Sequence, residues 1–423
     1  MNTENSVQSR KENVILVLLA SIQFAHVMDF MVMMPLGPQL MRNFQINTSE
    51  FGYIVSAYGI SSGIGGIIAA PFLDKYDRKK FLKLCLLGLF VGTLLCALAD
   101  KAHVLMAGRC IAGIFGGILG ALIQSIIADV FPLNRRGFAI SRVMLAFSLA
   151  SVLGVPAGLL LANKYGWHFP FYAVSFLLLI LFVTAQVFFP SLKGHIDPSV
   201  TVKQRVSQLV HFFGEANANV GFLASICIIM GQFMVIPFIS PFLVYNLGFG
   251  EENLPLLYLL GGISSIFTIP LIGKLTDKLN PYRASTIGIL LSIIPLFTLT
   301  HLNTPNKVLI LTTTTLFMVC MGGRMVPFTA MLTNVVPPHK RGGYLSITAS
   351  IQAMAQGSAA MLAAKLVSTG PNKELIGYEL SGWLAAAFSV ATVFLGLKIA
   401  KAAQNLERQT HSTPTSQPQP TSE

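Results

Sequence analysis

The chain contains the stretch Gly59-Ile60-Ser61-Ser62 twice, the second time as Gly262-Ile263-Ser264-Ser265. An acid followed by a lysine comes at the same distance after each copy, as Asp74-Lys75 and as Asp277-Lys278. Segments repeated at a constant offset are the sequence signature of an internal duplication. We therefore expect two structurally equivalent halves, joined near the middle of the chain.

The composition places both halves in a membrane. Only 11% of the residues are charged and 53% are hydrophobic, and the mean hydropathy is +0.66. Uncharged apolar runs such as 169–190 and 380–397 approach the roughly 20 residues that a membrane-crossing helix needs. Marking such runs between clusters of charge predicts about twelve crossings, roughly six in each half. The first run begins near Val14 and passes Asp29 without a small-residue cleavage site, which favours a transmembrane helix over a cleaved signal peptide.

The predicted fold class is an all-α membrane protein, with twelve transmembrane helices in two six-helix bundles related by a pseudo-twofold axis. Charge and composition divide the chain into segments. These are a cytoplasmic N-terminal tail (1–13), an N-terminal bundle (14–190), a cytoplasmic linker (191–216), a C-terminal bundle (217–400) and a disordered cytoplasmic tail rich in Ser, Thr, Pro and Gln (401–423).

Lysine and arginine set the expected orientation, because cytoplasmic loops carry an excess of both. Placing both termini in the cytoplasm leaves few basic residues in the outer loops, namely Arg42, Lys101, Lys164, Lys307 and Lys373. The net charge of +12 then follows from the topology and requires no nucleic-acid partner. We expect a monomeric integral protein of the bacterial cytoplasmic (inner) membrane, whose partners are the lipid bilayer, protons and a small-molecule substrate.

The sequence argues against an enzyme and against a metal protein. The five cysteines all fall inside apolar runs and form no CxxC pair, which disfavours disulfides and metal ligation. No HExxH or GxSxG motif supplies a metal site or a nucleophile. A non-transporting receptor is also disfavoured, because the chain has no large soluble domain. We therefore expect no catalytic residue, no metal and no cofactor, with the proton gradient as the energy source.

Asp29 is the most informative single residue, because it is the acid placed deepest in any apolar run. An ionised carboxylate at the centre of a membrane helix costs roughly 2.5–3.5 kcal/mol, and acids in such positions usually have a function. The equivalent position in the second half is Gln232, which cannot titrate. We interpret Asp29 as a proton-coupling group; the alternative is a structural carboxyl held by a neighbouring hydroxyl or amide.

Two further residues are expected to act with Asp29. Arg109 lies in the fourth run at a similar depth, ~10 Å below the outer surface at about 1.5 Å per residue, and its counterpart in the second half is Thr314. Opposite charges at one depth can offset each other's desolvation. His26 precedes Asp29 by one turn and shares its helical face. The alternatives are an arginine that extends to the membrane surface and a histidine that only fills the core.

Polar residues in other runs are candidates to line a substrate cavity: Gln124, Gln232, Arg324 and Gln352. Arg324 is a deep charge particular to the second half, since Leu119 occupies the matching position in the first.

The loop after the second run carries a recognisable motif. It reads Ala70-Pro71-Phe72-Leu73-Asp74-Lys75-Tyr76-Asp77-Arg78-Lys79 and resembles the sequence Gly-x-Leu-Ala-Asp-Arg-x-Gly-Arg-Lys of the major facilitator superfamily. The second copy, 273–278, keeps the opening glycine. The resemblance covers nearly all of 14–400 and is to drug/proton antiporters with twelve transmembrane helices, including the sugar- and arabinose-efflux-like members.

This resemblance implies a cytoplasmic gate built from Asp74, Arg78, Asp129, Asp277 and Arg341. In this gate Asp74 faces the positive N-terminus of the helix that follows Arg341, and Arg78 pairs with Asp129.

The resemblance also implies a function. Arg109 matches a fourth-helix arginine that the family links to proton coupling. In the fifth run, Gly154, Pro156 and Gly158 resemble the Gly-Pro-x-x-Gly-Gly motif of antiporters and are expected to kink the helix. The implied protein is a secondary active transporter, a proton-coupled antiporter that exports a small organic molecule (a drug-like compound, sugar or metabolite) by alternating access. The alternative is a proton symporter or facilitator that imports a small nutrient.

Overall fold

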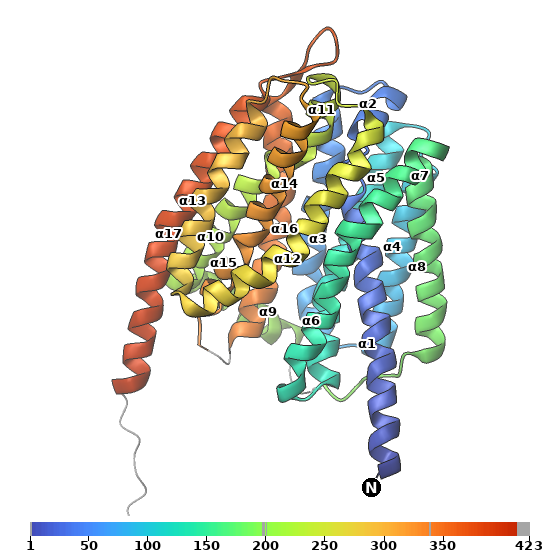
Figure 1. Ribbon diagram of the computed structural model, residues 1–423. Helices are drawn as coiled ribbons and strands as arrows, with labels where there is room; N and C mark the ends of the chain where they lie inside the picture. Colours follow the sequence, from blue (N-terminus) through green and yellow to red (C-terminus); the bar gives the residue numbers. More distant parts are fainter. Residues whose placement is uncertain (1, 197–198, 200, 338–339, 413–423) are drawn as a thin grey trace, which may run out of the picture.

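The computed structural model describes residues 2–196, 199, 201–337 and 340–412 of the chain. Long helices that run along one common direction make up almost the whole molecule (Figure 1). In this part of the chain the only strands are β1 (Ser368–Thr369) and β2 (Leu375–Ile376), which pair antiparallel. Helices dominate because a helix satisfies its own backbone hydrogen bonds within lipid. The predicted all-α fold class is confirmed.

The first half runs through the helical segments α1 (Asn2–Met31), α2 (Gly37–Phe44), α3 (Thr48–Leu73), α4 (Arg78–Ala97), α5 (Ala102–Val130), α6 (Leu133–Leu149), the π turn η1 (Ala150–Gly154), α7 (Val155–Tyr165) and α8 (His168–Phe188). The linker contributes α9 (Val202–His211) and the short 3-10 turn η2 (Phe212–Gly214).

The second half continues with α10 (Ala216–Phe233), η3 (Ile236–Phe238), α11 (Ile239–Tyr245), η4 (Glu251–Asn253), α12 (Leu254–Lys278), α13 (Pro281–Thr300), α14 (Lys307–Gly323), α15 (Met325–Leu332), α16 (Arg341–Leu366) and α17 (Tyr378–Ser412). The start of α1 and the end of α17 lie at one end of the molecule, opposite α2, α11 and the strand pair (Figure 1). The end away from the termini is termed the outer end below.

Within the described residues, 11 helices are long and apolar enough to cross a membrane. Beside them α16 runs over 26 residues, but it carries so many Ser, Thr, Gln and Gly residues that its hydropathy falls below theirs. Because α16 packs along α3, much of its surface does not meet lipid. With α16 the structure reaches the predicted twelve crossings.

Both ends of the described chain are more helical than the sequence analysis predicts. The helix α1 begins at Asn2, ahead of the first crossing, which starts at Glu12 and so close to the expected Val14. The helix α17 continues to Ser412, beyond the expected start of a disordered tail at 401. The segment that follows 401 contains the strong helix formers Ala, Gln, Leu and Arg before the first proline of the tail. The rest of that tail, 413–423, lies outside the described residues.

The two halves meet along two seams, and each copy of the repeated glycine lies on one of them. Gly59 of α3 packs so closely on α16 that a Cβ there would stand 2.6 Å from the backbone nitrogen of Gly357. Gly262 of α12 packs in the same way on η1, where a Cβ would meet a side-chain carbon of Val152 at 2.8 Å. The duplicated stretch therefore lies where two backbones approach closely, and only glycine leaves room for that.

The linker is fastened to the first half by Asp77, which caps the N-terminus of α4. Its carboxylate accepts hydrogen bonds from the Lys79 backbone nitrogen at 2.9 Å, the Ser191 hydroxyl at 2.6 Å and the Leu192 backbone nitrogen at 3.0 Å. Burial opposes the charged form, but these hydrogen bonds outweigh it and hold the pKa of Asp77 below its usual value. In the motif that residues 70–79 resemble, a glycine occupies this position, so the motif alone does not predict the anchor.

Replacing Gly59 with valine should force α3 away from α16. We expect a lower melting temperature of the purified protein in detergent, because overpacking a close contact typically costs about 1–3 kcal/mol. Gly273 on α12 is the matched control, since a Cβ there would meet no atom within 4 Å. Equal melting temperatures for Gly59→Val and Gly273→Val would show that the seam has no such tight contact.

Candidate functional site

A buried polar cluster in the first half surrounds Asp29 of α1. Asp29 is 0% exposed and Arg109 of α5 is 1% exposed. The Nη1 group of Arg109 donates to the carbonyl oxygen of Asp29 at 2.9 Å and to its carboxylate Oδ2 at 3.3 Å. The structure thus brings together the two opposite charges that the sequence places at one depth.

The other carboxylate oxygen of Asp29 contacts Thr93 of α4. The Thr93 hydroxyl oxygen lies 2.8 Å from Asp29 Oδ1 and 2.8 Å from the carbonyl oxygen of Leu89. A hydroxyl has one proton to donate and two lone pairs that accept, so Thr93 donates to only one of these oxygens at a time. When Asp29 is ionised, the Thr93 hydroxyl can donate a hydrogen bond to the carboxylate. When Asp29 is protonated, the same hydroxyl can accept a hydrogen bond from the carboxyl O–H and donate its own to the Leu89 carbonyl oxygen. The arrangement satisfies both protonation states.

Two aromatic side chains complete the cluster. The Arg109 guanidinium lies 4.2 Å from the ring centroid of Tyr58 on α3, within cation–π range. The Tyr58 hydroxyl and His26 Nε2 both lie against Gly116 of α5. The Tyr58 hydroxyl and His26 Nδ1 have no hydrogen-bond partner among the described residues. The structure therefore places His26 near Asp29 but does not join the two by a hydrogen bond.

The fifth crossing is interrupted beside this cluster. The π turn η1 ends at Gly154, and Pro156, which lacks a backbone N–H, follows in the first turn of α7. A Cβ on Gly154 would collide with the Met28 side chain, and a Cβ on Gly158 would lie 3.0 Å from Val32. Met28, on α1, and Val32, directly after its end, flank the buried acid in the sequence. The glycines of the motif thus allow α1 to run close against the fifth crossing.

In the second half, Arg324 is buried without an acidic partner. It is 1% exposed, and its guanidinium donates to the Ser292 hydroxyl at 3.1 Å, the Ser389 hydroxyl at 3.0 Å and the Ile228 carbonyl oxygen at 3.0 Å. No carboxylate of the described chain forms an ion pair with it. The structure therefore places Arg324 in the core of the second bundle, and not on the wall of a cavity as the sequence analysis expected, because neutral oxygens from three helices enclose it.

The three glutamines expected to line a cavity are more accessible. Gln124 is exposed, and Gln232 and Gln352 are half-buried. Within the described chain none of their amides has a hydrogen-bond partner, so all three remain available to water or to a ligand.

The residues that the resemblance assigns to a cytoplasmic gate are only partly brought together. Arg78 donates from Nε to Asp129 Oδ2 at 2.7 Å and from Nη2 to Asp74 Oδ1 at 2.9 Å, so the structure contains the expected Arg78–Asp129 pair. The second carboxylate oxygen of Asp74 lies 3.7 Å from Arg205 Nη1 on α9.

The contact of Asp74 with the N-terminus of α16, which the resemblance implied, is absent. The linker helix α9 packs against both α3 and α16, and Asp74 meets α9 instead. Asp277 is exposed and forms no ion pair with Arg341 or with any other described residue. The second copy of the motif therefore makes no gate contact in this structure.

At the outer end, polar contacts join the two bundles. Arg42 of α2 donates from Nη1 to Glu251 Oε1 at 2.6 Å and from Nη2 to Oε2 at 3.2 Å. Asn163 of α7 donates to the Glu251 carbonyl oxygen at 3.3 Å. We term Arg42, Asn163 and Glu251 the outer latch. Thr48 of α3 adds a hydrogen bond to the Val367 carbonyl oxygen at 3.1 Å.

Every hydrogen bond and ion pair between the two bundles in the described chain lies at this outer end. The structure is therefore in an outer-closed state. Sequence reasoning missed the latch, because it treated Arg42 only as an outer-loop cation. It also missed Thr93 and Tyr58, since single Thr and Tyr residues are common in membrane helices and carry no local signal.

No group of three or more His, Cys, Asp or Glu side chains that could hold a metal ion occurs among the residues described.

Comparisons with known proteins agree with this architecture. The family model of the Major Facilitator Superfamily matches residues 19–364. The chain belongs to the major facilitator superfamily, and it is a membrane transporter of that family.

Its relatives and structural neighbours are transporters. The uncharacterized MFS-type transporter YwfA of Bacillus subtilis (strain 168) is 23% identical over 420 residues, which cover 96% of this chain and 97% of the relative. Multidrug resistance protein 2 of the same organism is 24% identical and covers 65% of this chain and 70% of the relative. A crystal structure of a D-xylose-proton symporter has a TM-score of 0.74 at 18% identity, covering 90% of this chain and 96% of that chain. At that identity the likeness shows the fold alone.

Removing one side of the outer latch should favour the outer-open state. The Arg42 side chain is 52% exposed, and exposed ion pairs contribute about 0.2–1 kcal/mol. We therefore expect Arg42→Ala to shift the ratio of closed to open molecules by a few-fold. Pulsed EPR between spin labels on α2 and α11 measures that ratio. The charge-swapped variant Arg42→Glu/Glu251→Arg should restore it, and unchanged distances in Arg42→Ala would rule out a latch.

Proposed function

We propose that the protein is a proton-coupled antiporter that exports a small organic molecule, such as a drug-like compound, sugar or metabolite, by alternating access. The observation that carries this proposal is the environment of Asp29. Its carboxyl is fully buried, lies 3.3 Å from Arg109 Nη1 and meets a hydroxyl that can either donate or accept. These are the surroundings that a carboxyl needs if it is to be stable both with and without its proton.

The closed latch supports the direction of proton movement in this proposal. In the outer-closed state Asp29 is shielded from water and paired with Arg109, which suits the ionised form. Opening of the outer end gives water from outside access to the carboxyl, which then takes up a proton. On return to the outer-closed state, Arg109 competes for the carboxylate and the proton leaves towards the cytoplasm. Arg109 also donates to the Asp29 carbonyl oxygen at 2.9 Å, a contact that does not depend on the charge of the carboxyl.

Two observations favour export over import. The fifth crossing contains the Gly and Pro residues of the antiporter motif and packs directly on α1 beside Asp29. Two of the similar proteins bear the names multidrug resistance protein 2 and multidrug resistance protein 3, both of Bacillus subtilis (strain 168). Gln124, Gln232 and Gln352 are the polar groups that we assign to substrate contact, since their amides have no partner in the described chain.

The cellular setting completes the proposal. The excess of Lys and Arg at the end that carries both termini supports cytoplasmic termini. The bacterial relatives support the cytoplasmic (inner) membrane as the location. We propose a monomer that is driven by the proton gradient alone, without a cofactor.

Replacing Asp29 with asparagine should uncouple transport from the proton gradient. A substrate is first identified from growth of a pump-deficient host on a panel of toxic compounds and sugars. In proteoliposomes with an imposed pH gradient, we expect uphill transport by Asp29→Asn to fall to the passive leak, while substrate–substrate exchange continues, because the amide cannot release a proton. Asp100→Asn, at an exposed outer turn, is the matched control.

The same vesicles distinguish the alternative. Substrate that moves against the proton flux supports antiport, and substrate that moves with it identifies the importing symporter. Uphill export that persists in Asp29→Asn would remove this carboxyl from the mechanism.

Thr93 offers an independent test of the two-state hydrogen bond. Thr93→Val keeps the shape of the side chain but removes the hydroxyl. The Asp29 carboxyl then loses the partner that can serve both its ionised and its protonated state, and of its partners in the described chain only Arg109 remains beside it. We expect proton-driven transport to slow by about tenfold or more, since hydrogen bonds to charged groups contribute about 1.5–3 kcal/mol. The pH dependence of transport should change with it, and Thr93→Ser should restore both. Wild-type kinetics in Thr93→Val would contradict this role.

A further inference from the structure

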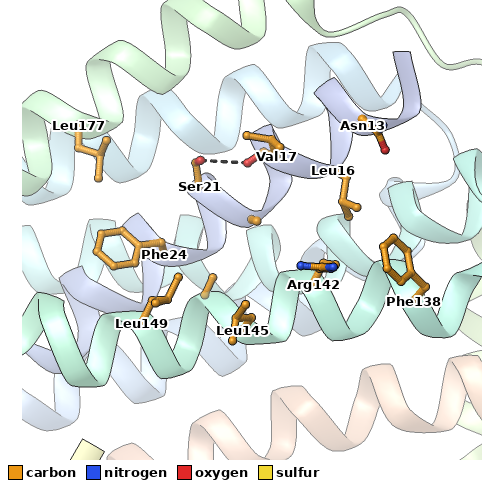
Figure 2. Close-up of a pocket in the computed structure, with 12 residues that line it drawn as sticks. Asn13, Leu16, Val17, Ser21, Phe24, Phe138, Arg142, Leu145, Leu149 and Leu177 are labelled. Atoms are coloured by element: carbon orange, nitrogen blue, oxygen red, sulfur yellow. Dashed lines mark hydrogen bonds between the residues drawn. The ribbon is translucent and has the colours of Figure 1, made fainter. Parts of the chain in front are cut away.

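A groove on the first half has no place in the mechanism above. It has a volume of about 660 Å³ and is lined by residues of α1, α6 and α8 (Figure 2). Its walls are mostly aliphatic and aromatic, as at Leu16, Phe24 and Leu149. The hydroxyl of Ser21 is already used, because it donates to the Val17 carbonyl oxygen at 2.9 Å. The groove therefore suits a ligand that is chiefly hydrocarbon.

The groove opens sideways from the molecule and not between the halves. All of its lining residues belong to the first half, whereas a cavity on the transport path is lined by both bundles. α7 packs against α8, but α6 packs against α1, so the fifth and sixth crossings separate towards the end that carries the termini. The lower part of α1 is visible between α6 and α8 (Figure 1). In a bilayer this face meets lipid.

The length of the groove matches one leaflet of a bilayer. Its lining residues on α1 run from Asn13, near the start of the crossing that begins at Glu12, to Phe24. At about 1.5 Å per residue this distance is ~16 Å. The hydrocarbon core of a bilayer is ~30 Å thick, so one leaflet contributes ~15 Å. An acyl chain of the leaflet on the side of the termini fits this length.

One charged residue, Arg142, lines the groove. It is exposed, and within the described chain it has no ion pair and no hydrogen bond; its guanidinium lies 5.1 Å from the ring centroid of Phe138. Arg135, two turns earlier on α6 and ~10 Å nearer the membrane surface, is already paired with Glu12 at 2.7 Å. Arg142 is therefore the cation at this site that still needs an anion.

An unpaired guanidinium inside a membrane crossing is costly, by roughly 2.5–3.5 kcal/mol on insertion scales. A phosphate is the anion that a bilayer supplies at this depth, since a long arginine side chain reaches towards the headgroups. Arginine binds phosphate oxygens through paired N–H donors. Basic pockets between transmembrane helices on the cytoplasmic side are recurrent sites for anionic lipid headgroups.

We propose that this groove binds one anionic phospholipid of the leaflet on the side of the termini. Its phosphate contacts Arg142, and one acyl chain lies along α1 and α6 as far as Phe24 and Leu149. Because α1 carries Asp29 and α6 leads into the interrupted fifth crossing, the lipid bridges two elements that the transport cycle moves. Its occupancy therefore affects the stability of the protein and the rate of transport.

The test uses the full chain in nanodiscs of phosphatidylcholine with or without phosphatidylglycerol, analysed by native mass spectrometry and thermal unfolding. We expect wild-type protein to retain one phosphatidylglycerol and to gain thermal stability from it. Arg142→Gln should bind this lipid about fivefold more weakly, which is the equivalent of ~1 kcal/mol per basic residue at the membrane surface. Ala20→Phe, which fills the groove and keeps Arg142, should also lose the bound lipid. A diazirine at the end of the acyl chain should label peptides that contain Phe24 or Leu149.

Arg283→Gln is the matched control, because Arg283 is an exposed arginine on α13, outside the groove. Both groove variants should melt at the wild-type temperature in lipid-free detergent, which separates lost binding from misfolding. If Arg283→Gln loses as much phosphatidylglycerol as Arg142→Gln, the loss reflects general surface charge, and the proposed site is overturned. If the protein retains phosphatidylcholine as well as it retains phosphatidylglycerol, the groove is an apolar surface that does not select a headgroup. If a dimer forms and covers Arg142, the occupant of the groove is a second copy of the chain. Either result would also overturn the proposal.

Discussion

A charge buried among apolar helices must be matched by another charge or by hydrogen bonds, and the two halves meet this requirement differently. In the first half Asp29 and Arg109 neutralise each other, with Thr93 as a third partner. In the second half neutral oxygens alone surround the guanidinium of Arg324. The first arrangement contains a carboxyl that can gain and lose a proton, and the second contains no such group. A duplicated scaffold thus acquires its functional asymmetry from which polar side chains it buries.

The two ends of the molecule are complementary. Hydrogen bonds and ion pairs between the bundles are present at the outer end, where Arg42 meets Glu251. The linker helix α9 packs against both α3 and α16. Arg78 and Asp129 pair within the first half, so their contact does not depend on how the halves are tilted. Alternating access requires the halves to be joined at one end at a time, and this distribution of contacts fits that requirement.

The sequence was sufficient for the architecture and for one functional pair, because both depend on local signals. Apolar runs and charge clusters predict the crossings, and counting inward from the charged ends predicts that Asp29 and Arg109 share a depth. The hydropathy signal is weaker for α16, because this helix is rich in polar and small residues. Its packing on α3 explains why such a composition is tolerated in a crossing helix. Partners brought together by tertiary structure were not predictable: Arg42 and Glu251 are 209 residues apart, and Asp74 meets a linker helix that its motif does not mention. Arg324 looked like a cavity residue because the serines that enclose it come from distant helices.

The glycine seam between α3 and α16 has a mechanical consequence. At Gly59 and Gly357 the backbones of α3 and α16 lie directly against each other, with no side chain between these two residues. This close backbone contact can act as a pivot: the outer ends of the two halves can separate while α3 and α16 remain in contact at Gly59 and Gly357. The counterpart contact of Gly262 with Val152 carries one side chain, so the two pivots resist tilting unequally.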